Sequence, residues 1–111
     1  MTRETLERYQ AIRKELRQLT RLLRSPEAKL IANTEKGQHL LAIYEEKRDA
    51  LIATQEQIEQ AIDSLSPTER TILRMRYIEG RSWTAISLDV YYSRQQAFRI
   101  AEKAIKKLEK L

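Results

Sequence analysis

The sequence predicts an all-α protein in which a coiled-coil-like helical hairpin precedes a three-helix domain. Only two glycines and two prolines interrupt 111 residues, 33% of which are charged. Apolar side chains recur at steps of three and four residues, as they do along one face of a helix. Serines with prolines, and the glycines, stand where those stripes stop. We place the hairpin at residues 1–65 and the three-helix domain at residues 66–111.

The first 65 residues carry two apolar stripes. One lies in a helix from Thr5 to Leu23, and a short helix follows it from Ser25-Pro26 to about Gly37. The other lies in a long helix, 38–64. The stripes comprise Leu6, Tyr9, Ile12, Leu16, Leu19 and Leu23, then Leu41, Tyr44, Leu51, Ile58, Ile62 and Leu65, with Arg48 and Gln55 interrupting the second. Two such stripes predict an antiparallel hairpin, and their heptad-like spacing leaves open a homodimer through the same helices.

The last 46 residues begin at the sharpest helix start in the chain. Ser66 and Glu69 match a capping box, and Pro67 occupies the first helical position. We expect this helix to run to about Ile78 and to stop at Gly80, which admits a left-handed cap. Its expected core residues are Ile72, Leu73 and Tyr77.

Two more helices are expected beyond Gly80. A short one, 83–89, starts from Ser82, and Ser93 is a natural N-cap for a last helix, 94–110. The expected inward residues are Trp83, Ile86 and Val90, then Ala97, Ile100, Ala101, Ala104 and Leu108. We interpret Trp83 as a core residue in preference to a platform for a ligand.

Composition argues against several classes of function. The chain lacks cysteine, and His39 is its only histidine, so no metal site or cofactor is expected. No nucleophile, base and orienting group stand together, and two glycines cannot form a phosphate-binding loop, so no enzyme activity is expected. Without a long apolar run, the chain is predicted to be cytoplasmic and not to enter a membrane.

Charge is distributed unevenly along the chain. Residues 1–65 carry 11 Lys or Arg and 11 Asp or Glu, whereas residues 66–111 carry 10 and 5. The whole net charge of +5 therefore lies in the three-helix domain. A local basic excess is typical of proteins that bind nucleic acid.

Three helices, of which the second is short and the third is capped, are typical of a helix-turn-helix that places its last helix in the major groove of DNA. If the alanine stripe of that helix is buried, Gln95 and Arg99 point outward, and Arg94 projects from its first turn. Arg pairs with guanine and Gln with adenine, so these three are the predicted base-reading residues. The predicted contacts to the DNA backbone are Arg74, Arg76, Ser93, Lys103, Lys106 and Lys107.

The same residues resemble region 4 of primary sigma factors. The segment Leu65 to Ile78, with its Leu-x-Pro-x-Glu opening, is similar to the start of that region. The segment Ser93 to Leu108 is similar to its recognition helix. A helical segment before a sigma-like end further resembles small phage and prophage regulators of the autolysin-regulator (ArpU) and RinA-type activator group.

This resemblance implies that Arg94, Gln95 and Arg99 contact bases. Sigma factors usually have an acidic residue where Gln95 stands, which implies a different base preference. Tyr91 and Phe98 also depart from the family pattern, and each is expected to contact either DNA or the N-terminal helices.

The sequence therefore predicts a DNA-binding transcription regulator that acts as a homodimer or through contact with RNA polymerase. Two alternatives remain open. One is a DNA-packaging protein of the small-terminase type, although such proteins usually place their DNA-binding part first. The other is an adaptor that binds RNA polymerase without reading DNA.

Overall fold

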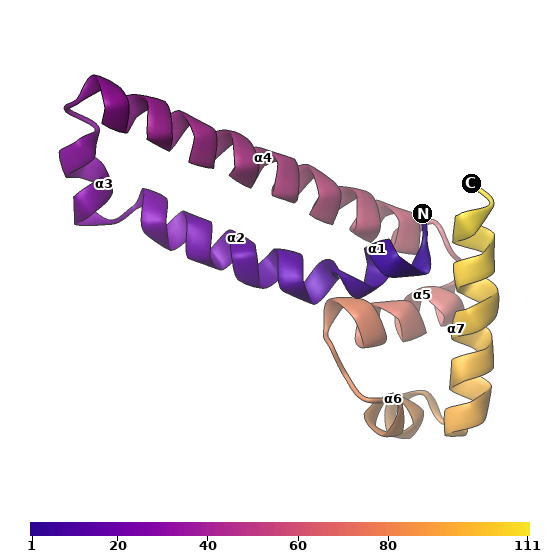
Figure 1. The fold of residues 1–111 in the computed structure, drawn as a ribbon. Coiled ribbons are helices and arrows are strands. Elements are labelled where there is room, and N and C mark those ends of the chain that lie inside the picture. The colour runs from indigo at the N-terminus through magenta and orange to yellow at the C-terminus, as the bar shows by residue number, and fades with distance from the viewer. The chain divides into compact units, whose positions relative to one another are not determined.

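The computed structural model describes residues 1–111, and every regular element in it is helical (Figure 1). This confirms the predicted all-α class. The elements are α1 (Arg3–Glu7), α2 (Tyr9–Leu23), α3 (Pro26–Ile31), α4 (Glu35–Asp63), α5 (Pro67–Leu73), the π-helical turn η1 (Arg74–Ile78), α6 (Trp83–Val90) and α7 (Arg94–Glu109). None of these helices combines the length and the apolar character needed to span a membrane.

The chain folds into two compact units. The main unit comprises residues 1–10 and 57–111, and the inserted unit comprises residues 11–56. The expected boundary lay at residue 65, whereas these boundaries cross α2 and α4. Leu6 and Tyr9 from the first stripe, with Ile58 and Ile62 from the second, are buried in the main unit. The ends of both long helices thus share a unit with the C-terminal helices.

In the inserted unit, α2 and α4 run side by side in opposite directions (Figure 1). Lys47 of α4 forms an ion pair with Glu15 of α2 at 2.9 Å. Ser25 caps α3 by accepting a hydrogen bond from the Ala28 amide at 3.1 Å, as Ser25-Pro26 predicted. The expected helix 5–23 is divided at Arg8, whose amide is shared between the carbonyls of Glu4 and Thr5.

The sequence suggested that the short helix ends at about Gly37, but it does not. That helix stops at Ile31, and Gly37 lies in the first turn of α4. The Thr34 hydroxyl accepts from the Gly37 amide at 2.9 Å, so the unrecognised start signal of α4 is Thr34. A Cβ on Gly37 would stand 1.8 Å from the Ile31 carbonyl oxygen. Gly37 is therefore required by this close approach and not as a helix terminator.

In the main unit, α7 packs against both α5 and α6. Ile72, Leu73, Ile86, Ile105 and Leu108 are at most 1% exposed and form the centre of this core. The predicted core positions Ala97, Ala101 and Ala104 are also buried, whereas Ile100 is only half-buried. Ile105, which was not predicted, completes the buried face of α7.

Residues near the N-terminus contribute to the main unit through polar contacts. Arg3 forms an ion pair with Glu102 of α7 at 2.5 Å. The Gln10 side chain donates to the carbonyls of Tyr77 and Ile78 at 3.0 and 2.5 Å. These carbonyls lie at the end of η1, where a helix lacks partners for its own acceptors. Gln10 therefore satisfies the helix end that precedes Gly80.

The predicted caps of this unit are present. Ser66 and Glu69 form the capping box of α5, Ser82 caps α6, and Ser93 caps α7. Gly80 has φ +70°, as the predicted left-handed stop requires.

Tyr91 is the one non-glycine residue with positive φ. It ends α6 with φ 60° and ψ 25°, and its side chain is 94% exposed. An L-residue in this left-handed conformation costs about 1–2 kcal/mol relative to its preferred regions. The turn between α6 and α7 therefore holds local backbone strain.

We predict that Tyr91→Gly is more stable than Tyr91→Ala by about 1 kcal/mol, because both remove the exposed ring but only glycine adopts this φ without strain. Urea unfolding of the two variants measures the difference. Equal stabilities would show that the turn imposes no such strain.

Glu69 links the start of α5 to the last turns of α7. Its carboxylate accepts from the Ser66 hydroxyl at 2.6 Å and from the Lys107 ammonium at 2.9 Å, and Glu69 is 8% exposed. Burial raises the pKa of the Glu69 carboxyl, but the bonds from Ser66 and Lys107 outweigh burial, so this pKa lies below its usual value. The ionised form is therefore favoured by folding.

We predict that Glu69→Gln lowers the free energy of unfolding by about 1–3 kcal/mol at pH 7, since it removes a buried charged acceptor. A folded pKa below the unfolded one gives stability that is complete above about pH 4.3 and is lost as the pH falls through the folded pKa. The difference in free energy of unfolding between wild type and variant should therefore be smaller at pH 3 than at pH 7, as measured by urea unfolding. Glu109→Gln, an exposed change on α7, is the control, and an equal gap at both pH values would contradict this account.

Candidate nucleic-acid interface

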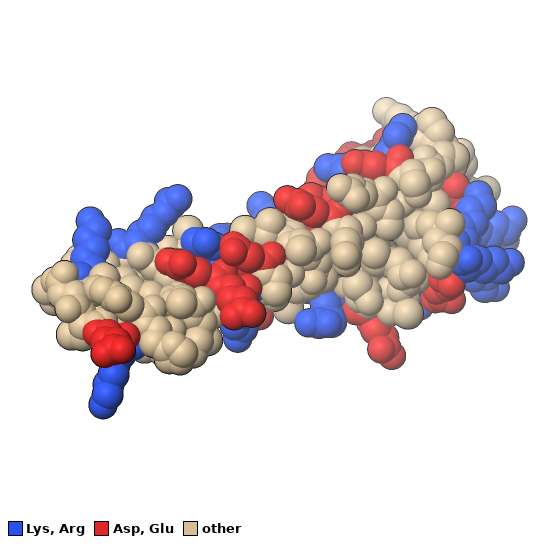
Figure 2. All heavy atoms as spheres, turned by 90° about the horizontal axis from the view of Figure 1, so that it is seen from above, with Lys and Arg blue, Asp and Glu red and all other residues tan.

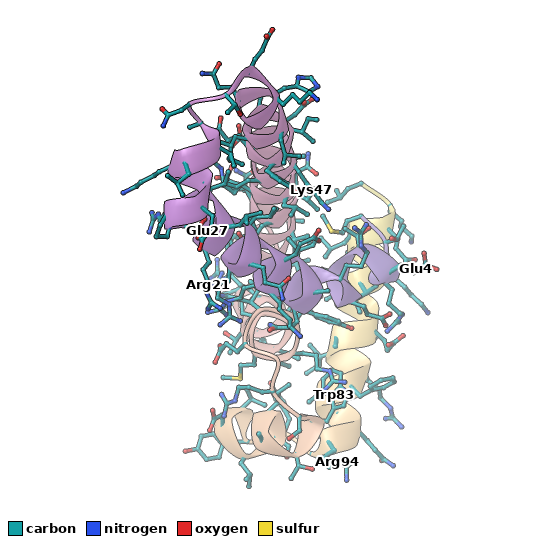
Figure 3. All side chains as sticks on the ribbon, turned by 60° about the vertical axis from the view of Figure 1, so that its left-hand side comes forward. Glu4, Arg21, Glu27, Lys47, Trp83 and Arg94 are labelled. Atoms are coloured by element: carbon teal, nitrogen blue, oxygen red, sulfur yellow. The ribbon has the colours of Figure 1, made fainter.

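The first two turns of α7 present the predicted base-reading residues on an open hollow. Ser93 begins the helix by accepting from the Gln96 amide at 3.1 Å, and Gln96 returns a bond to the Ser93 amide at 3.0 Å. This capping box fixes where α7 starts. Arg94, Gln95 and Arg99 then line one hollow with Trp83 and Phe98. Figure 3 shows Trp83 and Arg94 at the same end of α7, beside α6.

Helical spacing and burial together orient these side chains. The buried positions of α7, Ala97, Ala101 and Ala104, follow steps of four and three. At 100° per residue, Gln95 and Arg99 project from the opposite side, and both are exposed. Arg94, in the first turn, is also exposed. The structure thus brings together the three residues that the sequence singled out.

Trp83 forms the aromatic wall of the hollow. Its ring meets the Phe98 ring edge to face, with centroids 5.4 Å apart and planes at 74°. The Arg76 guanidinium lies 4.9 Å from the centre of the Trp83 ring, and it also donates to the Arg81 carbonyl at 3.0 Å. Trp83 is half-buried, which departs from the expected core position. It is a wall of the candidate site that contacts both Arg76 and Phe98.

Phe98 is 46% exposed and also lines the hollow. The sequence left open whether Phe98 contacts DNA or the N-terminal helices. Its ring contact is with Trp83 of α6. Tyr91 lies outside the hollow and projects into solvent.

Three of the predicted backbone contacts are occupied by partners within the fold. Arg74 forms an ion pair with Asp63 at 3.1 Å, and Lys107 pairs with Glu69 at 2.9 Å. Arg76 is held against Trp83. The two acidic partners are 11 and 38 residues away in sequence, and the third contact is made with the face of an aromatic ring. Composition and helical spacing could not reveal such contacts. Each of these three cations therefore has a partner within the fold.

Lys103 and Lys106 are exposed and have no acidic partner in the structure. They continue the outward face of α7 beyond Gln95 and Arg99, and Lys110 extends it further. Figure 2 shows Lys and Arg side chains gathered at the edge of the molecule that α7 forms. The outward face therefore joins a hollow with hydrogen-bonding groups to a row of unpaired positive charges. Such a surface suits a polyanion that also offers base edges.

Comparison with known proteins gives a family without an assigned activity. The family model described as "Protein of unknown function (DUF722)" matches residues 23–110, which is most of the chain, so the chain belongs to this family. No curated protein and no solved structure matches it.

Proposed function

We propose that this member of the DUF722 family is a transcription regulator that binds specific sequences of double-stranded DNA. In this proposal α6, the turn at residues 91–93 and α7 act as a helix-turn-helix, and α7 enters the major groove. One observation carries the proposal. Arg94, Gln95 and Arg99 share an exposed hollow on α7, while the opposite face of that helix is buried.

The chemistry of the hollow fits base edges. An arginine can donate two hydrogen bonds to O6 and N7 of guanine, and a glutamine can pair with N6 and N7 of adenine. Phe98 adds an apolar surface suited to the methyl group of thymine. The hollow therefore offers a different chemistry to three of the four bases.

The support beneath the hollow favours specific binding. Side chains that read bases must be held within fractions of an ångström, and sites on packed helices achieve this better than sites on loops. Here α7 is packed on α5 and α6, and Trp83 is fixed between Arg76 and Phe98. Little ordering of the hollow would be required on binding.

Phosphate contacts are assigned to Lys103 and Lys106. Both are exposed, both lack an internal partner, and both lie on the outward side of α7 beyond the base-reading residues. Contacts of this kind supply affinity without sequence preference. Arg74, Arg76 and Lys107 stay predicted backbone contacts, but each also has a partner within the fold, so we expect them to contribute less than Lys103 and Lys106.

A regulator also needs a way to act once it is bound. We propose a homodimer through the inserted unit, which exposes six large apolar side chains. They are Leu22, Leu30, Ile31, Leu40, Ile43 and Ile52. The resemblance to phage and prophage regulators supports a cytoplasmic protein that acts near a promoter, with RNA polymerase as a further proposed partner.

The test begins with selection of bound duplexes from a random DNA pool, followed by titration of the selected site across salt concentrations. Contact with four to six phosphates predicts a slope of log K against log salt of about −4 to −5. Trp83 is the only tryptophan, so its fluorescence should change on binding. A palindromic site with half-sites about one helical turn apart would indicate the dimer.

The variant Arg94→Ala plus Arg99→Ala should lose about 1–3 kcal/mol of discrimination for each arginine that reads a base. Its matched control is Lys103→Ala plus Lys106→Ala, which removes the same charge from the same helix. The control should weaken all sequences alike and make the slope less steep by about 1.8 for each bound protomer, with base preference retained. Identical behaviour of the two variants would contradict base reading by the hollow, and polymerase binding without DNA binding would favour an adaptor.

A further inference from the structure

Four arginines, three on α2 and one directly after its last residue, line one side of the inserted unit. Arg13, Arg17, Arg21 and Arg24 are spaced by four, four and three residues, and we call them the arginine face. All four are exposed, and together they line a shallow hollow. Figure 3 shows the Arg21 side chain extending outward from α2. The equal numbers of acids and bases in residues 1–65 conceal this concentration of positive charge.

None of these arginines has an acidic partner in the structure. The only acid of α2 is Glu15, and its carboxylate is paired with Lys47 of α4. Like charges at a spacing of four destabilise a helix by a few tenths of a kcal/mol for each pair. The arginine face therefore destabilises α2 slightly, and no ion pair within the protein offsets this destabilisation.

We infer that the arginine face binds the phosphate backbone of duplex DNA, as a second contact surface separate from α7. Guanidinium groups bind phosphate oxygens with two parallel hydrogen bonds, and they remain charged at any physiological pH. From Arg13 to Arg21 the helix rises about 12 Å, at about 1.5 Å per residue, and Arg24 follows directly after its end. A duplex carries one negative charge per about 1.7 Å, so every guanidinium has phosphates within that span.

The burial of α2 favours this ligand over a lipid surface. A helix that lies on a membrane inserts its apolar face between the lipids. The apolar face of α2 is occupied by the protein, with Ile12 at 2% and Leu19 at 8% exposure. Leu22 is the one large apolar side chain of α2 that is exposed, whereas the arginines dominate its accessible side, which suits a rigid polyanion.

The experiment uses the full chain and a random-sequence duplex of 40 base pairs, roughly four helical turns, so that DNA beyond one recognition site is present. The variant is Arg17→Gln plus Arg21→Gln, since glutamine keeps the helix propensity of arginine. The matched control is Lys29→Gln plus Lys36→Gln, which removes the same charge from exposed residues of the same unit outside the face. Circular dichroism shows whether both variants melt like wild type.

Loss of two phosphate contacts should make the slope of log K against log salt less steep by about 1.8, and weaken binding on the order of 100-fold at 0.05 M salt. The control should retain the wild-type slope. Equal slopes for variant, control and wild type would overturn the inference. It would also be overturned if the variant lost binding only to phosphatidylserine vesicles, or only to a second copy of the chain.

Failure of this inference is distinguishable from failure of the proposed function. If Arg94→Ala plus Arg99→Ala abolishes sequence preference while the α2 variant changes nothing, α7 reads DNA and the arginine face does not bind it. If the α2 variant reduces the salt slope while Arg94→Ala plus Arg99→Ala leaves sequence preference unchanged, the arginine face binds DNA and the hollow on α7 does not read it.

Discussion

The structure of the candidate site depends on the burial of one face of α7. Ala97, Ala101 and Ala104 have side chains small enough to let this helix lie close to α5 and α6, and Ile105 and Leu108 fill the remaining core. Burying these side chains fixes the rotation of α7 about its own axis. That rotation decides which residues face outward, and so it places Gln95 and Arg99 on the exposed side.

The structure separates the positively charged side chains into those with an acidic partner and those without one. Some cations hold the fold: Arg74 is paired with Asp63, Lys107 with Glu69, and Arg81 with Asp89. Others have no acidic partner: groups of these lie on the outward side of α7 and on the arginine face, and Lys14, Lys29 and Lys36 lie elsewhere. Because unpaired surface charge gives little stability, its concentration on two faces points to an anionic ligand.

Local signals in the sequence predicted most of the helix starts, and they predicted that Gln95 and Arg99 lie on the exposed side of α7. A capping serine acts on an amide three residues away, so Ser25, Ser82 and Ser93 could be recognised without the fold. The outward placement of Gln95 and Arg99 was predicted in the same way, because helical periodicity alone relates them to the buried alanines. Gly37 was misread, since the approach of the Ile31 carbonyl that requires glycine depends on a bend between two helices.

The remaining features arise from contacts between distant residues. No pattern could show that Arg3 meets Glu102, that Gln10 satisfies the end of η1, or that Lys107 is held by Glu69. For this reason Lys107 was assigned to DNA from the sequence. The aromatic wall of the hollow was also missed, because the exposure of Trp83 is set by how α6 meets α7.

The central claim is that α7 reads base edges in the major groove, and methylation interference on a selected duplex tests it most directly. A methyl group on guanine N7 blocks the acceptor that an arginine would use in that groove. The account predicts that methylation at particular guanines abolishes binding by wild type, and that Arg94→Ala plus Arg99→Ala removes this sensitivity. Binding that is indifferent to N7 methylation at every guanine would contradict it.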